Sequence, residues 1–560
     1  MTLTPYKDTL IDLRVSGDEY DSLNAYAKDL PAIRLSERAI HDFELLATGA
    51  LSPLTQFMGK ADYESVLGEM RLSDGTLFPL PITLAVDSDA PISLDTDIAL
   101  RTKRNYLLAV MRVEEIYAWD IATHARQIFH SVEHPMVSDL YRQGNLHIAG
   151  QVRVLRLPPR YDFPELRLSP AEVRERLRSI GHKNVLAFQS RNPMNRAQEA
   201  MLRRALDDLD ASLLLQAIVG MSSPYDVDHY TRVRSYTTLL ENYLPKETTL
   251  LSLLPLSVRL AGGREALLQA IIARNYGATH LPIGRDHASP GGDFYPPYDG
   301  HDLLKQHQDE IGIEVLPDRE WVYLPDDDRY EDSQTLDDSQ QRIHLSSVAM
   351  KRGYLDKGKK VPEWFVRSEV ADILAEAYPP KHQRGVCIWF TGLSGAGKST
   401  TASIVAAMLR AHGRQVTLLD GDIVRQNLSR GLGFSKADRD TNVRRIGFVA
   451  SEIVRHGGVA ICAAISPYQT TRADVRHMVG DGFVEVFVDT PLEVCEARDT
   501  KGLYAKARRG QIKGFTGVDD PYEVPDTPDV HLRTTTTTVE NNAHQVLNYL
   551  IEHEFILPLV

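Results

Sequence analysis

The chain has 560 residues and a formal net charge of −13 at pH 7. This length exceeds what a single hydrophobic core usually serves, so we expect three or four domains. The acidic balance argues against general binding of nucleic acids or anionic membranes, and it requires any anionic substrate to be met by a local basic pocket.

The N-terminal segment MTLTPYKDTL lacks the basic stretch and apolar core of a signal peptide. No apolar run approaches the length of a membrane span. The three cysteines, Cys387, Cys462 and Cys495, all lie in the last third of the chain, two of them in strongly apolar stretches. We therefore expect buried, reduced thiols in a cytoplasmic protein.

Composition and periodicity divide the chain into four predicted domains. Short alternating segments broken by Asp, Gly and Pro predict a β-rich first domain with some helices. Helical and strand patterns then alternate, which predicts strands joined by crossover helices. A polar, irregular stretch follows, whose acidic run PDDDRYEDS we interpret as a solvated loop, before a second α/β pattern. The predicted domains are residues 1–168, 169–325, 326–380 and 381–560, and the fold class is α/β multidomain.

The motif GLSGAGKS (392–399) fits G-x-x-x-x-G-K-[ST] between an apolar, strand-like run and a helical pattern. Its glycines let the backbone curl so that N–H groups face a phosphate chain, and the following helix offers its positive end. Lys398 adds a charge at the β- and γ-phosphates, and Ser399 is a candidate Mg²⁺ ligand. The predicted ATP-binding residues are Gly392, Leu393, Ser394, Gly395, Ala396, Gly397, Lys398, Ser399 and Thr400.

The next predicted strand ends in LLDGD, which places Asp420 and Asp422 at the edge where open α/β sheets bind ligands. A carboxylate there holds Mg²⁺ or orients an acceptor hydroxyl, and Asp422 is the candidate for the second role. A turn-forming DGD is the structural alternative. A basic, amide-rich patch follows that suits an anionic, aromatic acceptor. Its residues are Arg425, Asn427, Phe434, Arg439, Asn442, Arg444 and Arg445.

The run ARDTKGLYAKARRG (497–510) is strongly cationic. We interpret it as a helix that closes over phosphates like a lid, and a solvated helix face is the alternative.

Several motifs together resemble adenylylsulfate (APS) kinase over residues 380–560: DGDIVRQNL, GFSKADRDTNVRRIG, ISPY, DTPLEVCEARDTKGLY and FTGVDDPYE. The resemblance implies a P-loop kinase domain that transfers the ATP γ-phosphate to the 3′-hydroxyl of APS, giving PAPS, with Asp422 assisting that hydroxyl. Ser466 in ISPY is described in the family as a phosphoserine; we expect it to position substrate, because in-line transfer needs no covalent intermediate. The implied APS-binding residues are Arg425, Arg439 and Asn442 for the phosphosulfate end, Phe434 and Phe515 for the adenine, and Lys501, Gly502 and Leu503 for the closing segment, with Asp420 and Asn427 beside them.

Residues 1–375 resemble ATP sulfurylase through LSPLTQFMG, QSRNP, RVRSY, RLAGGREALLQAIIARNYGATHLPIGRDHA and VPEWF. The resemblance implies a PUA-like first domain and a Rossmann-like nucleotidyltransferase domain. It also implies a reaction that joins sulfate to the α-phosphate of ATP and releases pyrophosphate. The product of that reaction is the APS that the kinase consumes.

The sequence departs from this second family at the expected nucleotide site. The family's QxRNP loop continues into His-x-x-His, whereas Asn195 and Gln198 stand at these positions here. An amide donates a hydrogen bond but cannot become cationic, and losing two such donors costs around 10⁴-fold if the effects add. Further departures are Gln216-Ala217, MSSPYD (221–226) and the segment 258–263. The residues retained are Gln189, Arg191, Asn192, Arg285 and His287.

We therefore predict an APS kinase whose sulfurylase-like region is an oligomerisation scaffold with little or no turnover. A site rebuilt from Arg191, Arg196, His287 and the amides of Asn195 and Gln198, and so a fully bifunctional enzyme, is the first alternative. A non-catalytic regulatory module that binds APS or PAPS is the second, and the retention of Lys398, Ser399 and Asp422 argues against it. We expect ATP with Mg²⁺, APS and a homo-oligomer as partners, and the resemblance suggests a hexamer.

Overall fold

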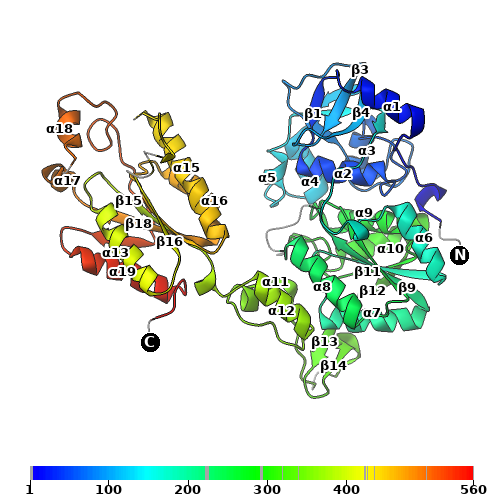
Figure 1. Cartoon of the computed structure of the whole chain (residues 1–560). Helices are drawn as coiled ribbons and strands as arrows, with labels where there is room; N and C mark the ends of the chain where they lie inside the picture. Colours follow the sequence, from blue (N-terminus) through cyan, green and yellow to red (C-terminus); the bar gives the residue numbers. More distant parts are fainter. Residues whose placement is uncertain are drawn as a thin grey trace. The chain divides into compact units, whose positions relative to one another are not determined.

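The computed structural model describes residues 4–220, 226–290, 294–317, 320–337, 340–421, 424, 427–433, 435–499 and 501–558. The chain forms two compact units (Figure 1). Unit 1 comprises Met1–Lys351 and Lys360–Ala377, and unit 2 comprises Arg352–Lys359 and Tyr378–Val560. Within these described ranges, no helix is both long enough and apolar enough to span a bilayer.

The first part of unit 1 contains two small sheets, in the orders β1-β3-β4-β7 and β2-β6-β5. The predicted combination of short strands with helices is confirmed, and the helices contain more of the residues than the strands do. The strands are β1 (Ala32–Arg34), β2 (Leu84–Val86), β3 (Thr96–Arg101), β4 (Leu107–Val113), β5 (Glu115–Ala118), β6 (Leu146–Ala149) and β7 (Val152–Val154), and the helices are α1 (Gly17–Tyr26), α2 (Glu37–Ala47), α3 (Lys60–Glu69), α4 (Ile121–Phe129) and α5 (Val137–Leu140).

The second part of unit 1 is a five-stranded parallel sheet in the order β10-β9-β8-β11-β12, as the α/β pattern predicts. Strand β9 is buried along its whole length, and its register with β8 places Gln189 opposite Gln216. The strands are β8 (Asn184–Ser190), β9 (Ala211–Ile218), β10 (Thr249–Leu254), β11 (His280–Ile283) and β12 (Glu314–Pro317), and the helices are α6 (Pro170–Ile180), α7 (Arg196–Leu209), α8 (His229–Asn242), α9 (Gly262–Asn275) and α10 (Asp299–Ile311).

Unit 1 ends in a small subdomain, and its structure differs from the prediction that the acidic run PDDDRYEDS is a solvated loop. The acidic run is a solvated loop only in its first half, because Arg329–Asp332 form β14, which pairs antiparallel with β13 (Trp321–Leu324). The ring of Tyr323 stacks on Trp364, with 5.5 Å between centroids and 9° between planes, so a distant aromatic residue stabilises the hairpin. The helices here are α11 (Ser347–Met350) and α12 (Ser368–Ala377).

Unit 2 is built on a parallel sheet in the order β16-β17-β15-β18-β19. Helices α13 and α19 pack against each other on one face, and α15 and α16 on the other (Figure 1). The strands are β15 (Val386–Thr391), β16 (Val416–Asp420), β17 (Val459–Ala463), β18 (Phe483–Asp489) and β19 (Val530–Arg533), and the helices are α13 (Lys398–Ala411), α15 (Lys436–Arg455), α16 (Gln469–Val479), α17 (Leu492–Arg498), α18 (Leu503–Arg508) and α19 (Val539–Glu552).

The central strand β15 is buried on both faces, as parallel strands covered by helices are. Its side chains alternate: Ile388 and Phe390 pack in the layer of α13 and α19, whereas Cys387 and Trp389 pack in the layer of α15 and α16. All three cysteines are free and buried, which confirms the prediction of buried thiols.

The cationic run 497–510 is not one helix. Helix α17 ends at Arg498, and α18 begins after Gly502, whose φ of 64° is unfavourable for residues with a Cβ. The Asp499 carboxylate accepts hydrogen bonds from the N–H groups of Tyr504 and Ala505, which fixes the start of α18. The prediction of a single lid helix is therefore wrong.

Three almost fully buried histidines make unit 1 sensitive to acid. Burial lowers the pKa of His134 to about 4 and that of His41 and His147 to about 3, and nearby arginines add to the effect at His41. A histidine with a lowered folded-state pKa contributes its full stability above the unfolded pKa of 6.5, and this contribution is lost as pH falls below that value. Going from pH ~7.5 to ~5.5, these three histidines together are expected to lower the free energy of unfolding by roughly 4 kcal/mol, about 1.4 kcal/mol for each histidine.

Scanning calorimetry of the full chain at these two pH values measures this loss in the transition of unit 1. His147→Gln is expected to remove about 1.4 kcal/mol of the pH dependence of unit 1. His456→Gln, which changes an exposed histidine of unit 2, is the control variant. A transition temperature of unit 1 that does not fall on acidification would contradict the prediction.

Candidate active sites

Unit 2 carries a strongly curved loop between β15 and α13. Gly392, Gly395 and Gly397 have φ angles of 144°, 77° and 106°, which side chains with a Cβ rarely adopt. A Cβ at Gly392 would also lie 2.6 Å from the carbonyl oxygen of Val488. We call residues 392–397 the phosphate loop.

The carbonyl oxygens of the phosphate loop accept hydrogen bonds from side chains around it. The pairs are Lys398 Nζ with Gly392 O (2.9 Å) and Leu393 O (2.7 Å), Tyr504 OH with Ser394 O (2.9 Å), Arg498 Nη1 with Gly395 O (3.3 Å), and Thr490 Oγ1 with Ala396 O (3.0 Å). In a trans peptide the C=O and the following N–H point in opposite directions. A loop whose carbonyls are held by side chains suits the arrangement in which its N–H groups face an anion, as the motif predicts.

Lys398 begins α13, and its side chain is almost fully buried. Burial lowers the pKa of its ammonium group to about 8, so most of the positive charge is kept at neutral pH. Its two hydrogen bonds go to neutral carbonyls. A bound phosphate chain would provide the counter-charge that a buried cation requires. The predicted residues Ser399 and Thr400 follow on the same first turn and are exposed.

The predicted acceptor residues lie near the carboxyl edge of the same sheet, where the structure describes them. Asp420 ends β16, the strand paired with β17. Arg439 on α15 pairs with the Asp520 carboxylate at 2.9 Å and donates to the Thr516 hydroxyl at 2.5 Å. The predicted residues Asp422, Arg425 and Phe434 lie outside the described residues.

The remaining acceptor candidates occupy three segments of unit 2. The Asn442 side-chain oxygen accepts a hydrogen bond from the Ser429 hydroxyl, two residues after the exposed Asn427. Phe515 is buried and packs edge-on against Tyr504. Lys501, Gly502 and Leu503 form the connection into α18.

Sequence reasoning missed the donors that hold the phosphate loop. Thr490, Arg498 and Tyr504 lie about a hundred residues after the carbonyls that they contact. Arg498 and Tyr504 belong to the cationic run 497–510, whose charge is visible in the sequence but whose contacts with the loop depend on the tertiary fold.

Ser466 sits at the end of β17, with a φ of 41° and a buried hydroxyl. Its Oγ accepts a hydrogen bond from Trp389 Nε1 at 3.0 Å and donates to Thr391 Oγ1 at 3.0 Å. Thr391 in turn pairs with the Tyr522 hydroxyl at 2.9 Å. The Ser466 hydroxyl is thus committed to a buried network directly before the phosphate loop.

For the phosphoryl transfer to APS that the resemblance implies, Ser466→Ala is expected to lower kcat by less than about tenfold, because it removes two hydrogen bonds of a supporting network and no reacting group. Steady-state kinetics of the purified chain measures this. Ser451→Ala removes another buried hydroxyl, which bonds Phe448 O at 2.8 Å on α15, and is the matched control. Loss of all activity in Ser466→Ala alone would favour a phosphoserine route.

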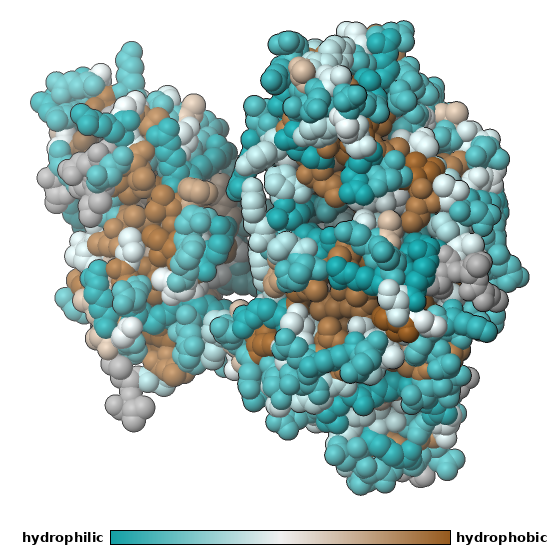
Figure 2. Space-filling model, turned by 45° about the vertical axis from the view of Figure 1, so that its right-hand side comes forward, coloured by the Kyte–Doolittle hydropathy of each residue, from teal (hydrophilic) through white to brown (hydrophobic). Residues whose placement is uncertain are grey.

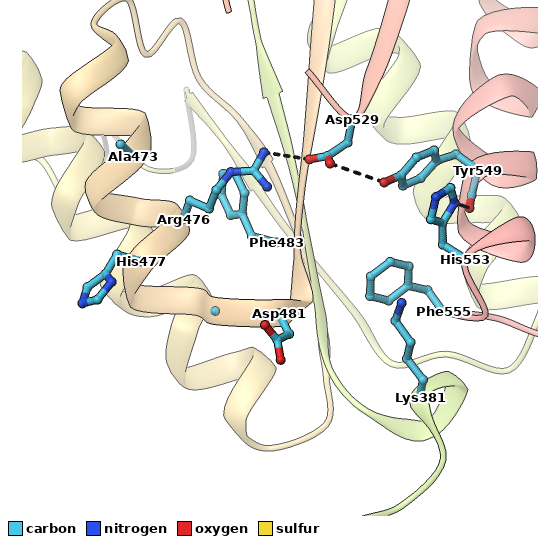
Figure 3. Close-up of a pocket in the computed structure, with 11 residues that line it drawn as sticks. Lys381, Ala473, Arg476, His477, Asp481, Phe483, Asp529, Tyr549, His553 and Phe555 are labelled. Atoms are coloured by element: carbon cyan, nitrogen blue, oxygen red, sulfur yellow. Dashed lines mark hydrogen bonds and ion pairs between the residues drawn. The ribbon is translucent and has the colours of Figure 1, made fainter. Parts of the chain in front are cut away.

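A pocket of about 610 Å³ lies at the opposite, amino-terminal edge of this sheet, between α16 and α19 (Figure 3). Phe483, at the start of β18, forms part of its wall. Its Arg476 is paired with Asp529 at 2.8 Å, and its Lys381 lies over the Phe555 ring at 4.0 Å. It contains none of the predicted site residues. Open α/β sheets bind their ligands at the carboxyl edge, so the phosphate loop remains the candidate site of unit 2.

Unit 1 has a second candidate site at the carboxyl end of β8. Gln189 Nε2 donates to Gln216 Oε1 at 2.9 Å between two buried side chains. The other amide atoms, Gln189 Oε1 and Gln216 Nε2, have no hydrogen-bond partner in the described part of the chain. Buried polar atoms of this kind call for a ligand or water.

Asn195 and Gln198 are used to cap helix α7. Asn195 Oδ1 accepts from the Gln198 N–H at 2.8 Å, and Gln198 Oε1 accepts from the Asn195 N–H at 3.1 Å, which is a capping box. Arg196 donates to Glu363 O at 3.1 Å and lies over the Tyr330 ring, so the prediction that it helps to rebuild the site lacks support from its contacts.

The other retained residues surround the same edge. Arg191 lies 3.5 Å from the Asp226 carboxylate, and Asn192 Oδ1 accepts from the Val227 N–H at 3.1 Å. His287 Nε2 pairs with Gln269 Oε1 at 2.7 Å. Burial, with a contribution from the nearby Arg191, lowers the pKa of His287 to about 4, so this imidazole is neutral near pH 7. Arg285, two residues earlier, is exposed.

Comparisons with known proteins match three family models in sequence: PUA-like domain over residues 3–157, ATP-sulfurylase over 164–377, and adenylylsulphate kinase over 384–533. A protein of Chaetomium globosum named sulfate adenylyltransferase is 41% identical, with 100% of both chains covered. A protein of Yarrowia lipolytica with the same name is 41% identical over 99% of this chain and 100% of its own. The solved structure of a hexameric APS kinase from Thiobacillus denitrificans aligns with a TM-score of 0.80 and 35% identity over 99% of each chain.

Proposed function

The chain belongs to the family of sulfate adenylyltransferases that join PUA-like, ATP-sulfurylase and adenylylsulphate kinase domains in one chain. From this premise we propose that unit 2 is a working APS kinase. It transfers the γ-phosphate of ATP to the 3′-hydroxyl of APS and forms ADP and PAPS. The observation that carries the proposal is the phosphate loop, whose carbonyl oxygens accept hydrogen bonds from Thr490, Arg498, Tyr504 and the buried Lys398.

Different residues of unit 2 bind the phosphates and orient the acceptor hydroxyl in the proposed phosphoryl transfer. The N–H groups of the phosphate loop and Lys398 hold the β- and γ-phosphates, and Asp422 orients the acceptor hydroxyl. The Ser399 hydroxyl and the Asp420 carboxylate are oxygen donors of the kind that Mg²⁺ prefers. Bound Mg²⁺ would neutralise charge between the β- and γ-phosphates.

The residues proposed to bind the phosphoryl acceptor suit the two chemical groups of APS, its phosphosulfate and its adenine. Arg439 offers a planar guanidinium that suits a phosphosulfate group, although Asp520 now pairs with it. Phe515 supplies an aromatic surface for adenine. Asn442, Lys501, Gly502 and Leu503 complete the proposed pocket, with Arg425, Asn427 and Phe434.

Sulfate adenylyltransferase activity in unit 1 is a second candidate function, and the names of the full-length relatives favour it. Those names give no support to a silent scaffold, whereas the full-length structural neighbour is named only as a kinase. The buried, unpartnered amide atoms of Gln189 and Gln216 suit a bound nucleotide. The use of Asn195 and Gln198 as helix caps argues for slow turnover.

Two assays of the purified chain separate these functions. PAPS formation from ATP, Mg²⁺ and APS tests the kinase, and ATP formation from APS and pyrophosphate tests the adenylyltransferase in its favourable direction. A chain that binds APS but forms neither product would favour a regulatory module instead.

Self-association is the remaining part of the proposal. The structural neighbour, which aligns with nearly the whole chain, is named as a hexamer. Apolar side chains are gathered among hydrophilic ones on the faces visible in Figure 2, and Phe448 on α15 is 61% exposed. We therefore propose a homo-oligomer of the full chain.

A further inference from the structure

The Tyr504 side chain of unit 2 contacts both the phosphate loop and Phe515, a residue of the proposed APS pocket. The Tyr504 hydroxyl donates to Ser394 O of the phosphate loop at 2.9 Å. The Tyr504 ring meets the Phe515 ring edge-on, with 5.0 Å between centroids and 82° between planes. Tyr504 is 3% exposed and Phe515 is 4% exposed, so both contacts are shielded from water, which strengthens the hydrogen bond.

A chain of contacts connects Phe515 to Arg439, which is proposed to bind the phosphosulfate group. The neighbouring Thr516 hydroxyl accepts from Arg439, and Arg439 pairs with Asp520. The Phe515 carbonyl oxygen accepts from the Asp520 N–H at 3.3 Å, which closes this turn on itself. A shift of the Phe515 ring therefore affects the segment that holds Arg439.

The segment before Tyr504 is anchored beneath the same phosphate loop. Arg498 donates to Gly395 O, one residue after the acceptor of Tyr504. The Asp499 carboxylate accepts from the Tyr504 N–H at 3.1 Å. The position of the Tyr504 side chain is thus tied at its backbone to the start of α18 and at its hydroxyl to the loop.

We propose that Tyr504 is a positioning residue that transmits occupancy of the phosphate loop to the APS pocket, an inference that rests on the proposed kinase function. A nucleotide that fixes the Ser394 peptide fixes the acceptor of the Tyr504 hydroxyl, and the Tyr504 ring then holds Phe515 in place. APS binds more tightly once the nucleotide is bound, and by reciprocity the nucleotide binds more tightly once APS is bound.

Tyr504→Phe tests this because it keeps the ring and its edge contact and removes only the hydroxyl. Calorimetric titration of the full chain with APS, with and without the ATP analogue AMPPNP, measures how much the nucleotide enhances APS binding. The enhancement is expected to fall about fivefold, the size of one hydrogen bond, while APS affinity without nucleotide changes by less than about twofold. In kinetics the KM for APS rises and kcat stays nearly constant.

Tyr549→Phe is the matched control, because it removes a hydroxyl that bonds Asp529 at 3.3 Å and contacts neither site. An unchanged enhancement in Tyr504→Phe would overturn the proposal, and so would an equal loss of APS affinity with and without nucleotide. In the wild type, AMPPNP is expected to slow amide hydrogen exchange in α18, and unchanged exchange would also overturn it. A wild type that forms no PAPS would contradict the proposed function, while the titrations would still measure the coupling.

Discussion

Lys398→Ala is expected to abolish PAPS formation, with a fall in kcat/KM for ATP of roughly 1,000-fold or more. The ammonium group is a buried cation next to the phosphate loop, and within the described part of the chain it donates to Gly392 O and Leu393 O. It can exchange these neutral acceptors for phosphate oxygens, on which negative charge increases as the γ-phosphoryl group is transferred.

The matched control is Lys381→Ala, which removes a lysine of the same unit at the opposite edge of the sheet, where it lies over the Phe555 ring. Both variants are expected to keep the wild-type molar mass in light scattering, because neither side chain belongs to the buried apolar clusters of unit 2. PAPS formation that survived Lys398→Ala would show that the phosphate loop has been assigned wrongly. An equal loss in Lys381→Ala would point to a general defect of unit 2 instead.

The elements with a strong local pattern were the predictable ones. The apolar run before GLSGAGKS and the helical spacing after it gave β15 and α13, because a buried parallel strand and a helix differ in period and the glycines separate them. Strand β14 is not predictable locally, because it continues an acidic run and its sequence, Arg-Tyr-Glu-Asp, shows no apolar alternation. It forms through its pairing with β13, whose Tyr323 stacks on the distant Trp364. The break between α17 and α18 was missed because the charge of the run suggested one helix, although Gly502 within it was a visible helix breaker.

The residues of the candidate sites likewise fall into those that a local sequence pattern predicts and those that only the tertiary fold brings together. The loop glycines and Lys398 can be recognised from spacing alone, because the geometry that they form is local. Tyr504 as a donor to Ser394 O cannot be recognised so, since only the tertiary fold brings together residues this far apart. The capping box of α7 is intermediate: Asn at the first position and Gln three residues later is a known signature, but the same two residues were considered only as lost phosphate ligands.

The second large expected effect concerns the rate at which unit 1 forms ATP. With APS and pyrophosphate as substrates, the wild-type chain is expected to form ATP about 10⁴-fold more slowly than a site with two cationic donors at positions 195 and 198. Both amide oxygens there are occupied by helix N–H groups, and neither side chain can become cationic. Luminescent detection of ATP measures this rate. A robust wild-type rate would reject the silent scaffold and establish the second candidate function, as the names of the relatives favour.

The double variant Asn195→His with Gln198→His tests the cause of the slow rate. It is expected to raise ATP formation measurably without restoring it fully, because Gln216 and Ala217 still replace another family motif and because the loss of the cap costs α7 about 1 kcal/mol. Adding Arg191→Ala to the double variant is the control: this change removes the remaining cation at the end of β8, so the gained activity should disappear while PAPS formation in unit 2 continues. Full recovery in the double variant would show that two cationic side chains at the start of α7 suffice and that the neighbouring loops contribute little.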